Sequence, residues 1–280
     1  MDRARIVDLL RLYRVKDWVH FLPLPLVGWC ATPAPRSVAV LAGSVLGWAL
    51  ALAYASALNQ AFDGRVDRLQ RSKNPVGSRL AVPEALQLAA LPLCAAPVVV
   101  GLLAPAGLAA LAVFVAAATL YSAPPRLKRV PLLGTLWNLL VGVPGMFFAA
   151  RPAALAPPSP LLVGLFCLLL LASQLLHEAQ DRDDDAQGGV PTVATLGGRR
   201  LALRSAAAVL LAVPLAGFWL AGALTHRWAL TVVLALFSAA WAAVLAARPA
   251  AGTASLRRLR MAFRYTALAL GAVVLGLAST

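Results

Sequence analysis

Residues 37–67 read SVAVLAGSVLGWALALAYASALNQAFDGRVD, and this stretch decides the fold class. Its first part, Ser37–Asn59, carries no charged side chain. It is long enough for a membrane-spanning helix, which needs about 20 apolar residues. Its last part places two aspartates directly after that helix. The pattern predicts a helix that crosses a bilayer and carries acidic groups at its end.

The composition of the whole chain is typical of a membrane protein. Of 280 residues, 61% are hydrophobic and 13% are charged, whereas soluble domains carry about 25% charged residues. So few polar side chains cannot cover a soluble surface, which excludes a cytoplasmic globular enzyme, a disordered chain and a nucleic-acid-binding domain. The apolar runs are continuous rather than alternating, so we expect an all-α, polytopic membrane protein and no β-barrel. The lipid bilayer is its first expected partner.

We predict nine transmembrane helices in a single membrane domain over residues 1–280, with a basic cytoplasmic segment at residues 1–17. The predicted spans are Val19–Pro33, Ser37–Asn59, Leu86–Ala104, Gly107–Tyr121, Leu132–Ala150, Pro160–Leu176, Leu201–Ala223, Trp228–Ala247 and Arg260–Ala278. Proline and glycine gather in the connections between spans, as expected of turns. The three cysteines are scattered through apolar stretches, which argues against disulfides and against metal binding by cysteine.

The positive charges predict the orientation in the membrane. With nine spans, 22 of the 25 Lys and Arg residues fall on the side of the N-terminus, and Arg36, Arg151 and Arg227 fall on the other. Positively charged loops stay in the cytoplasm. We therefore expect a cytoplasmic N-terminus and a C-terminus on the opposite side, in the plasma or inner membrane if the protein is bacterial. The net charge of +14 then reflects topology, and no nucleic-acid partner is expected.

Seven of the 11 acidic residues lie in two clusters, both on the predicted cytoplasmic side. In the first, Asn59, Asp63 and Asp67 are spaced i, i+4, i+8, so they share one helix face if the helix continues through Asp67. Like charges at this spacing destabilise a helix unless a cation lies between them. Carboxylate and amide oxygens suit Mg²⁺, which takes one or two carboxylates together with substrate phosphates. The first cluster therefore predicts a cation site.

The second cluster places Glu178, Asp181 and Asp185 at i, i+3, i+7, with Asp184 beside that stripe. Gly188 and Gly189 follow and are expected to end the helix. Two acidic faces predict two cations and a substrate with several phosphate charges. Basic side chains on the same side are candidates to hold a leaving diphosphate: Arg65, Lys73, Arg79, Arg126 and Lys128. The alternative is a transporter or proton relay, although these acids lie at helix ends rather than at mid-membrane.

The two motifs resemble those of the UbiA superfamily of intramembrane prenyltransferases. Asn59-x-x-x-Asp63-x-x-x-Asp67 matches the first aspartate-rich motif of that family, and Asp181-x-x-Asp184-Asp185 is similar to the second. The second segment is closest to members that prenylate 4-hydroxybenzoate. The stretch from Tyr121 to Lys128, YSAPPRLK, resembles the loop after helix four in chlorophyll-synthase-like members. The nine-helix count also agrees with that family.

Two departures leave the acceptor open. The family often has Arg-Pro-Leu after the first motif, where this chain has Lys73-Asn74-Pro75-Val76. The segment Lys16-Asp17-Trp18 looks like the phosphoribosyl-transferring branch. The alternatives on the same fold are therefore phosphoribosyl transfer to a polyprenyl phosphate and prenylation of a carotenoid or chlorin.

The resemblance implies a UbiA-type helical bundle and an Mg²⁺-dependent prenyltransferase. Asn59, Asp63 and Asp67 would bind one Mg²⁺, and Asp181 and Asp185 a second. Both ions would bind the diphosphate of an allylic polyprenyl donor, which Lys128, Arg126 and Lys73 would neutralise further. The other implied substrate-binding residues are Arg65, Arg79, Tyr121, Glu178 and Asp184. The prenyl group would pass to an aromatic or other lipophilic acceptor, a quinone precursor in the first instance, and diphosphate would leave.

The nine-span topology predicts that the two ends of the chain lie on opposite sides of the membrane. Green fluorescent protein should fluoresce when fused to the N-terminus, and alkaline phosphatase should be active when fused to the C-terminus, in a bacterial host. The reason is that an odd number of spans separates the two ends. A fluorescent C-terminal fusion would contradict nine spans.

Overall fold

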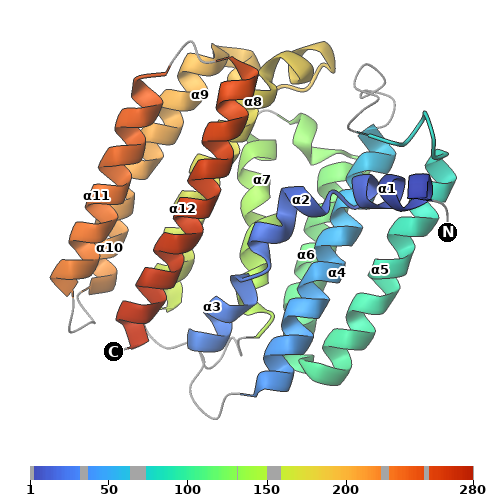
Figure 1. The fold of residues 1–280 in the computed structure, drawn as a ribbon, viewed down its shortest axis with the longest axis horizontal. Coiled ribbons are helices and arrows are strands. Elements are labelled where there is room, and N and C mark those ends of the chain that lie inside the picture. Colours follow the sequence, from blue (N-terminus) through green and yellow to red (C-terminus); the bar gives the residue numbers. More distant parts are fainter. Residues whose placement is uncertain are drawn as a thin grey trace. The chain divides into compact units, whose positions relative to one another are not determined.

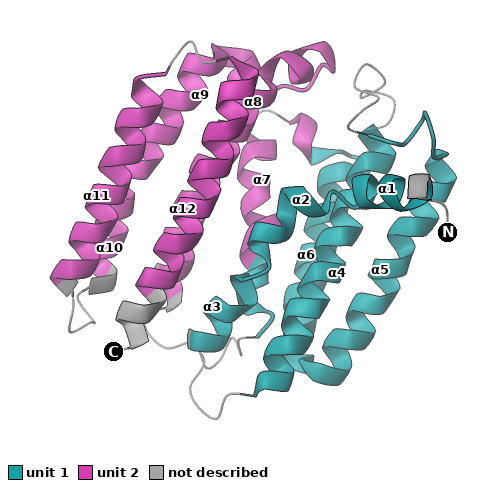
Figure 2. Cartoon of the chain, viewed as in Figure 1, with its two compact units in different colours: residues 1–127, 144–154 teal, residues 128–143, 155–280 magenta. Residues whose placement is uncertain are grey.

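The computed structural model describes residues 3–31, 37–63, 74–130, 132–149, 159–221, 227–248 and 252–279. Within these ranges the regular structure is helical, apart from an isolated bridge between Val76 and Leu80. The all-α prediction is confirmed for this part of the chain. The chain forms two compact units, residues 1–127 with 144–154 and residues 128–143 with 155–280 (Figure 2).

The helices follow one another along the chain as labelled in Figure 1. The first unit contains α1 (Arg3–Leu12), α2 (Val15–Trp18), α3 (Leu24–Ala31), α4 (Val38–Asp63), α5 (Val82–Leu103) and α6 (Leu108–Ser122). The second unit contains α7 (Leu133–Gly142), α8 (Ser159–Gln187), α9 (Val193–Leu211), α10 (Val213–Ala221), α11 (Arg227–Ala246) and α12 (Thr253–Ser279). Short 3-10 turns lie at Val19–Phe21, Pro105–Gly107, Leu127–Arg129 and Val143–Phe147.

In the described ranges, six helices are long and apolar enough to cross a bilayer, which indicates an integral membrane protein. They are Val38–Asp63, Val82–Leu103, Pro105–Ser122, Leu162–Gln187, Val193–Trp219 and Trp228–Ala246, and they match six of the nine predicted spans. A shorter apolar helix, Leu133–Phe147, lies in the predicted span 132–150. The predicted span 19–33 contains α3, which has eight residues. The last predicted span lies within α12, and the count of nine stays a prediction.

Small residues bring α4 and α5 close together in the first unit. A Cβ atom placed on Gly43 would fall 2.3 Å from Leu103 Cβ, and one on Gly47 would fall 2.2 Å from Val100 Cγ2. The two backbones therefore approach more closely than larger residues would allow. Close approach at glycine and alanine is the usual way in which membrane helices gain packing contacts, because lipid tails provide no hydrophobic drive between them.

A buried tryptophan joins α4 to the rest of the first unit. Trp48 is fully buried, and its ring meets Phe114 of α6 and Phe148 edge-on at 4.8 and 5.2 Å. Its indole N–H donates to the carbonyl of Phe21 at 2.9 Å. The polar atom of this large ring is thus satisfied, as buried polar groups must be.

The basic N-terminal helix α1 packs against the end of α4 that carries Asp63. Leu12 is fully buried in a cluster with residues of α4, α5 and the segment before α5: Tyr54, Ala57, Leu58, Ala61, Val76, Leu80, Ala85 and Ala89. The Tyr13 hydroxyl donates to the carbonyl of Leu88 at 2.9 Å, and Arg5 forms an ion pair with Glu84. The acidic end of α4 is therefore supported from the N-terminal segment.

In the second unit α8 is one continuous helix that packs against α7, α9, α10 and α12. It ends at Gln187, followed by a turn at Gly188 and Gly189. Gly189 has a φ of +63°, which a glycine adopts without steric cost. Thr192 then starts α9 through a capping box with Thr195. The predicted end of the acidic helix at this glycine pair is confirmed.

Gly107→Ala should destabilise the protein. A Cβ atom at Gly107 would lie 2.5 Å from the backbone oxygen of Phe148, which cannot move as a side chain can. Overpacking of this kind costs about 1–3 kcal/mol. Thermal unfolding in detergent, followed by intrinsic fluorescence, measures the change. Gly101→Ala is the matched control, because nothing lies within 4 Å of its Cβ position. An unchanged melting temperature for Gly107→Ala would contradict the packing described.

Candidate active site

The acidic end of α4 is held by the end of α6 and the residues after it. The Ser122 hydroxyl donates to Asn59 Oδ1 at 3.3 Å, and Arg126 Nη2 donates to Asp63 Oδ1 at 2.6 Å. The two side chains of the Arg126–Asp63 pair are 18% and 17% exposed, so solvent screens this pair less than one at the surface. Asn59 and Asp63 lie one turn apart on α4, as predicted. Asp67, Arg65 and Lys73 lie outside the described residues.

A tight turn brings Arg126 to Asp63. After α6, the amide of Arg126 donates to the carbonyl of Ala123 at 2.7 Å. Arg126 itself has a φ of +60°, which is uncommon for a residue with a side chain. Tyr121 is partly buried on the last turn of α6, and its predicted role in substrate binding stays a prediction. The proline-containing loop after α6 therefore places one cationic side chain, Arg126, beside the first acidic cluster.

Arg79 has a different partner from the one expected of a diphosphate ligand. Its Nε lies 3.0 Å from Asp8 Oδ1 on α1, and the Asp8 side chain is 12% exposed. The ion pair ties the turn before α5 to the N-terminal helix. A substrate-binding role for Arg79 stays a prediction.

The second acidic cluster lies on the last turns of α8. The helix continues without a break to Gln187. The side chains of Glu178, Asp181 and Asp185 therefore lie along one stripe of α8, as predicted. Asp185 is in electrostatic range of Asp181, Glu178 and Asp184, and the opposing charge comes from Lys128. Four carboxylates and one lysine thus form a mainly negative group within the second unit.

Lys128 is held in place by close contact between its backbone and the start of α7. A Cβ atom on Gly134 would lie 2.7 Å from the Lys128 oxygen and 2.9 Å from its Cα, so only glycine allows this approach. The next residue, Thr135, donates its hydroxyl to Glu178 Oε1 on α8 at 2.6 Å. The turn that carries Lys128 is thereby connected to the acidic stretch of α8.

Glu178 is buried and bonded on both oxygens. It is 3% exposed. Its Oε1 accepts from Thr135 and from Gln174, the latter at 3.2 Å, and its Oε2 accepts the Val193 amide at 3.0 Å. Val193 is the first residue of α9, where a negative charge also suits the helix dipole. Glu178 therefore joins α7, α8 and α9, and its predicted contact with substrate stays a prediction.

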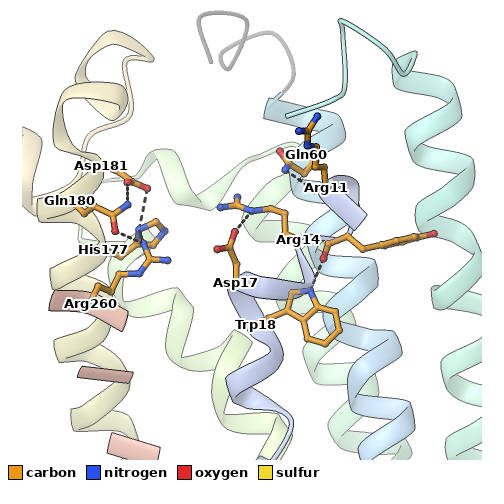
Figure 3. A network of polar contacts seen from close by, with 10 residues as sticks. Arg11, Arg14, Asp17, Trp18, Gln60, His177, Gln180, Asp181 and Arg260 are labelled. Atoms are coloured by element: carbon orange, nitrogen blue, oxygen red, sulfur yellow. Dashed lines mark hydrogen bonds and ion pairs between the residues drawn. The ribbon is translucent and has the colours of Figure 1, made fainter. Parts of the chain in front are cut away.

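Asp181 is contacted by two neighbours on its own helix (Figure 3). Gln180 Nε2 donates to Asp181 Oδ1, and His177 Nδ1 lies 3.1 Å from Oδ2. Both neighbours in turn meet Arg260 of α12. Within the described residues, no three His, Cys, Asp or Glu side chains are placed to hold a metal ion by themselves.

A family comparison decides what kind of protein carries these groups. The model of the UbiA prenyltransferase family matches residues 21–277. The protein belongs to the UbiA prenyltransferase family. It is therefore a transferase by family, and the resemblance drawn from the two motifs is confirmed. A comparison with curated protein sequences finds no match.

Solved structures share the UbiA fold at low sequence identity. A UbiA homologue from Archaeoglobus fulgidus bound to GPP and Mg²⁺ has a TM-score of 0.78 and 17% identity, covering 96% of this chain and 99% of that one. The apo homologue from Aeropyrum pernix K1 has a TM-score of 0.62 and 21% identity, covering 95% and 97%. A structure of digeranylgeranylglyceryl phosphate synthase has a TM-score of 0.72 and 15% identity, covering 99% of each chain. These likenesses confirm the UbiA-type helical fold.

In this UbiA protein, the side chains that support the acids are not marked by any motif in the sequence. Thr135 and Gln180 are ordinary polar residues, and nothing in their spacing marks them. Arg260 carried a signal, because an arginine at the start of a predicted span is costly unless it is paired. The structure shows that Arg260 faces α8 (Figure 3).

Glu178→Gln should lower the thermal stability of this UbiA protein. An amide has one oxygen, so at least one of the buried donors that now meet Glu178 would lose its acceptor. An unsatisfied buried group costs about 1–3 kcal/mol. Thermal unfolding in detergent measures the change, with Asp183→Asn on the same helix as the control. Asp183 is 53% exposed and pairs at the surface with Arg199. Equal melting temperatures for the two variants would contradict the buried role of Glu178.

Proposed function

We propose that the protein transfers a prenyl group from an allylic prenyl diphosphate to an aromatic or other lipophilic acceptor, with release of diphosphate. A quinone precursor is the leading acceptor class. The observation that carries the proposal is the pair of acid-bearing helix ends, on α4 and α8, in a member of the UbiA prenyltransferase family. Each acidic end has a basic side chain beside it, Arg126 at Asp63 and Lys128 near Asp185.

The residues present fit Mg²⁺. Asn59, Asp63 and Asp67 would supply an amide oxygen and carboxylates for one ion, and Asp181 and Asp185 would supply carboxylates for another. Mg²⁺ keeps waters and takes substrate phosphates as ligands, so one or two protein carboxylates at each ion are sufficient. The negative charges around Asp185 repel one another, which a divalent cation would relieve. The A. fulgidus homologue is bound to GPP and Mg²⁺, which supports the same donor class and metal here.

The bound metal would supply positive charge for the leaving diphosphate. Side chains of this chain would supply the rest of the positive charge around it. The bond that breaks joins C1 of the prenyl group to the diphosphate oxygen, and both electrons leave with the diphosphate. Lys128 and Arg126, with Lys73, would add positive charge where this negative charge develops, which is the largest usual contribution to such catalysis. The acceptor then bonds to C1 and loses a proton.

The acceptor panel should extend beyond aromatic compounds. One structural neighbour is a digeranylgeranylglyceryl phosphate synthase, so glycerophosphate lipids belong in the panel. Phosphoribosyl transfer to a polyprenyl phosphate and prenylation of a carotenoid or chlorin are the other reactions proposed for this fold. We also propose that residues 1–280 act as one membrane domain with its acidic helix ends at the cytoplasmic face, because basic residues flank both clusters.

Diphosphate release from purified protein in lipid vesicles tests the proposal. Allylic diphosphates of several lengths are supplied with the acceptor panel, with Mg²⁺ or with EDTA. We expect release that needs Mg²⁺ and one acceptor class. Asp63→Ala and Asp181→Ala should each lower turnover about a hundredfold or more, the scale expected for losing an electrostatic contact at the reacting centre.

Asp183→Asn is the matched control, because Asp183 is an exposed carboxylate on the same helix as Asp181 and pairs with Arg199. It should keep near-normal turnover. Near-normal turnover of both alanine variants would overturn the metal assignment. Absence of release with every donor, from folded protein, would overturn prenyl transfer itself.

A further inference from the structure

Arg260 of α12 is a buried cation that faces the acidic stretch of α8. The residue is 6% exposed, and a buried charge is costly unless it is paired and hydrogen-bonded. Its Nη1 donates to Gln180 Oε1 at 3.1 Å and lies 2.5 Å from His177 Nδ1. One turn further along α12, Arg264 Nε donates to Ser173 Oγ at 3.5 Å. Arg260 and Arg264, four residues apart, therefore lie on the same face of α12, and this face packs against α8.

Gln180 links Arg260 to Asp181 in one direction only. The side chain of Gln180 is an amide with one accepting end and one donating end. Because a guanidinium can only donate, Arg260 requires the oxygen of Gln180 to face it. The nitrogen of Gln180 then faces Asp181 and donates to Oδ1. A flipped amide would set two donors against each other on one side and two acceptors on the other.

His177 lies at the other oxygen of Asp181. Its Nδ1 is 3.1 Å from Asp181 Oδ2 and also within hydrogen-bond distance of Arg260. Because Arg260 can only donate, Nδ1 accepts from it and the ring proton lies on Nε2. His177 therefore lies beside the carboxylate without donating to it, and Gln180 is the side chain that donates to Asp181. Both oxygens of Asp181 are thus bordered by side chains that meet the same arginine nitrogen (Figure 3).

We infer that Arg260 is a positioning residue: through Gln180 it holds the Asp181 carboxylate in the orientation in which it binds the cation of the donor complex. The inference rests on the proposed function, and it assigns to Arg260 no contact with substrate. A carboxylate that is already oriented loses less conformational freedom when the cation arrives. Residues that orient metal ligands in this way typically change metal affinity by about 10–100-fold when they are removed.

The test compares three methionine variants of the full-length protein in detergent. The relay is the chain of hydrogen bonds from Arg260 through Gln180 to Asp181. Arg260→Met removes its buried charge, whereas Gln180→Met removes the connecting amide and keeps that charge. Arg257→Met is the matched control, since Arg257 is an exposed arginine on the same helix. The direct readout is Mn²⁺ affinity, measured by electron paramagnetic resonance with a geranyl thiolodiphosphate that reacts slowly. Melting temperature is recorded for each variant, and kcat and KM for the donor are measured separately.

We expect Arg260→Met and Gln180→Met each to weaken Mn²⁺ binding about tenfold, with Arg257→Met unchanged. The double variant should be no weaker than the worse single variant, because residues that act along one relay are not additive. Arg260→Lys should recover part of the affinity, since an ammonium also donates to Gln180. The turnover of the two relay variants should recover at high Mg²⁺, which a general loss of folding would not allow.

Two results would overturn the inference. One is wild-type Mn²⁺ affinity in Gln180→Met or Arg260→Met. The other is a weakening that follows melting temperature alone and is additive in the double variant. These outcomes are distinguishable from failure of the proposed function, because in that case the wild-type protein itself would bind no Mn²⁺ with the thiolodiphosphate.

Discussion

Carboxylates at the ends of apolar helices need partners, because water does not fully solvate them there and burying an unpaired charge is costly. Much of the described structure follows from this requirement. Asp63 at the end of α4 is paired with Arg126, and Glu178 on α8 has three donors from three helices. Each partner comes from a different part of the chain, so satisfying the acid also joins the helices. The same contacts therefore satisfy the acidic groups and pack the helix ends against their neighbours.

The two units meet this requirement in different ways. In the first unit a charged side chain meets the acid directly, as Arg126 does at Asp63, and the turn after α6 is bent to allow it. In the second unit Asp181 is linked to the buried Arg260 through Gln180. A direct ion pair neutralises its carboxylate, whereas a relay orients the carboxylate and keeps the arginine at a distance.

Much of the site could be predicted from the sequence because it is local. Asn59 and Asp63, or Glu178, Asp181 and Asp185, share a face as soon as their segments are helical, and the apolar runs before them show that they are. Their supporting partners could not be predicted in this way. Thr135 and Glu178 are far apart in the chain, as are Gln180 and Arg260, and only the packing of α7 and α12 on α8 brings them together. Arg79 shows the reverse case, since its position near the first motif did not reveal its bond to Asp8.

The sequence by itself determined the class of the protein, the positions of the six membrane-crossing helices that are found among the described residues, and the presence of two acidic helix ends. It could do so because hydropathy and helical periodicity are properties of neighbouring residues. The UbiA family could also be identified from two short motifs. The tertiary structure decided which side chain satisfies each acid. Hydrogen bonds between helices depend on distances of about 3 Å, and such distances are set by how side chains interlock across helices rather than by the order of residues along the chain.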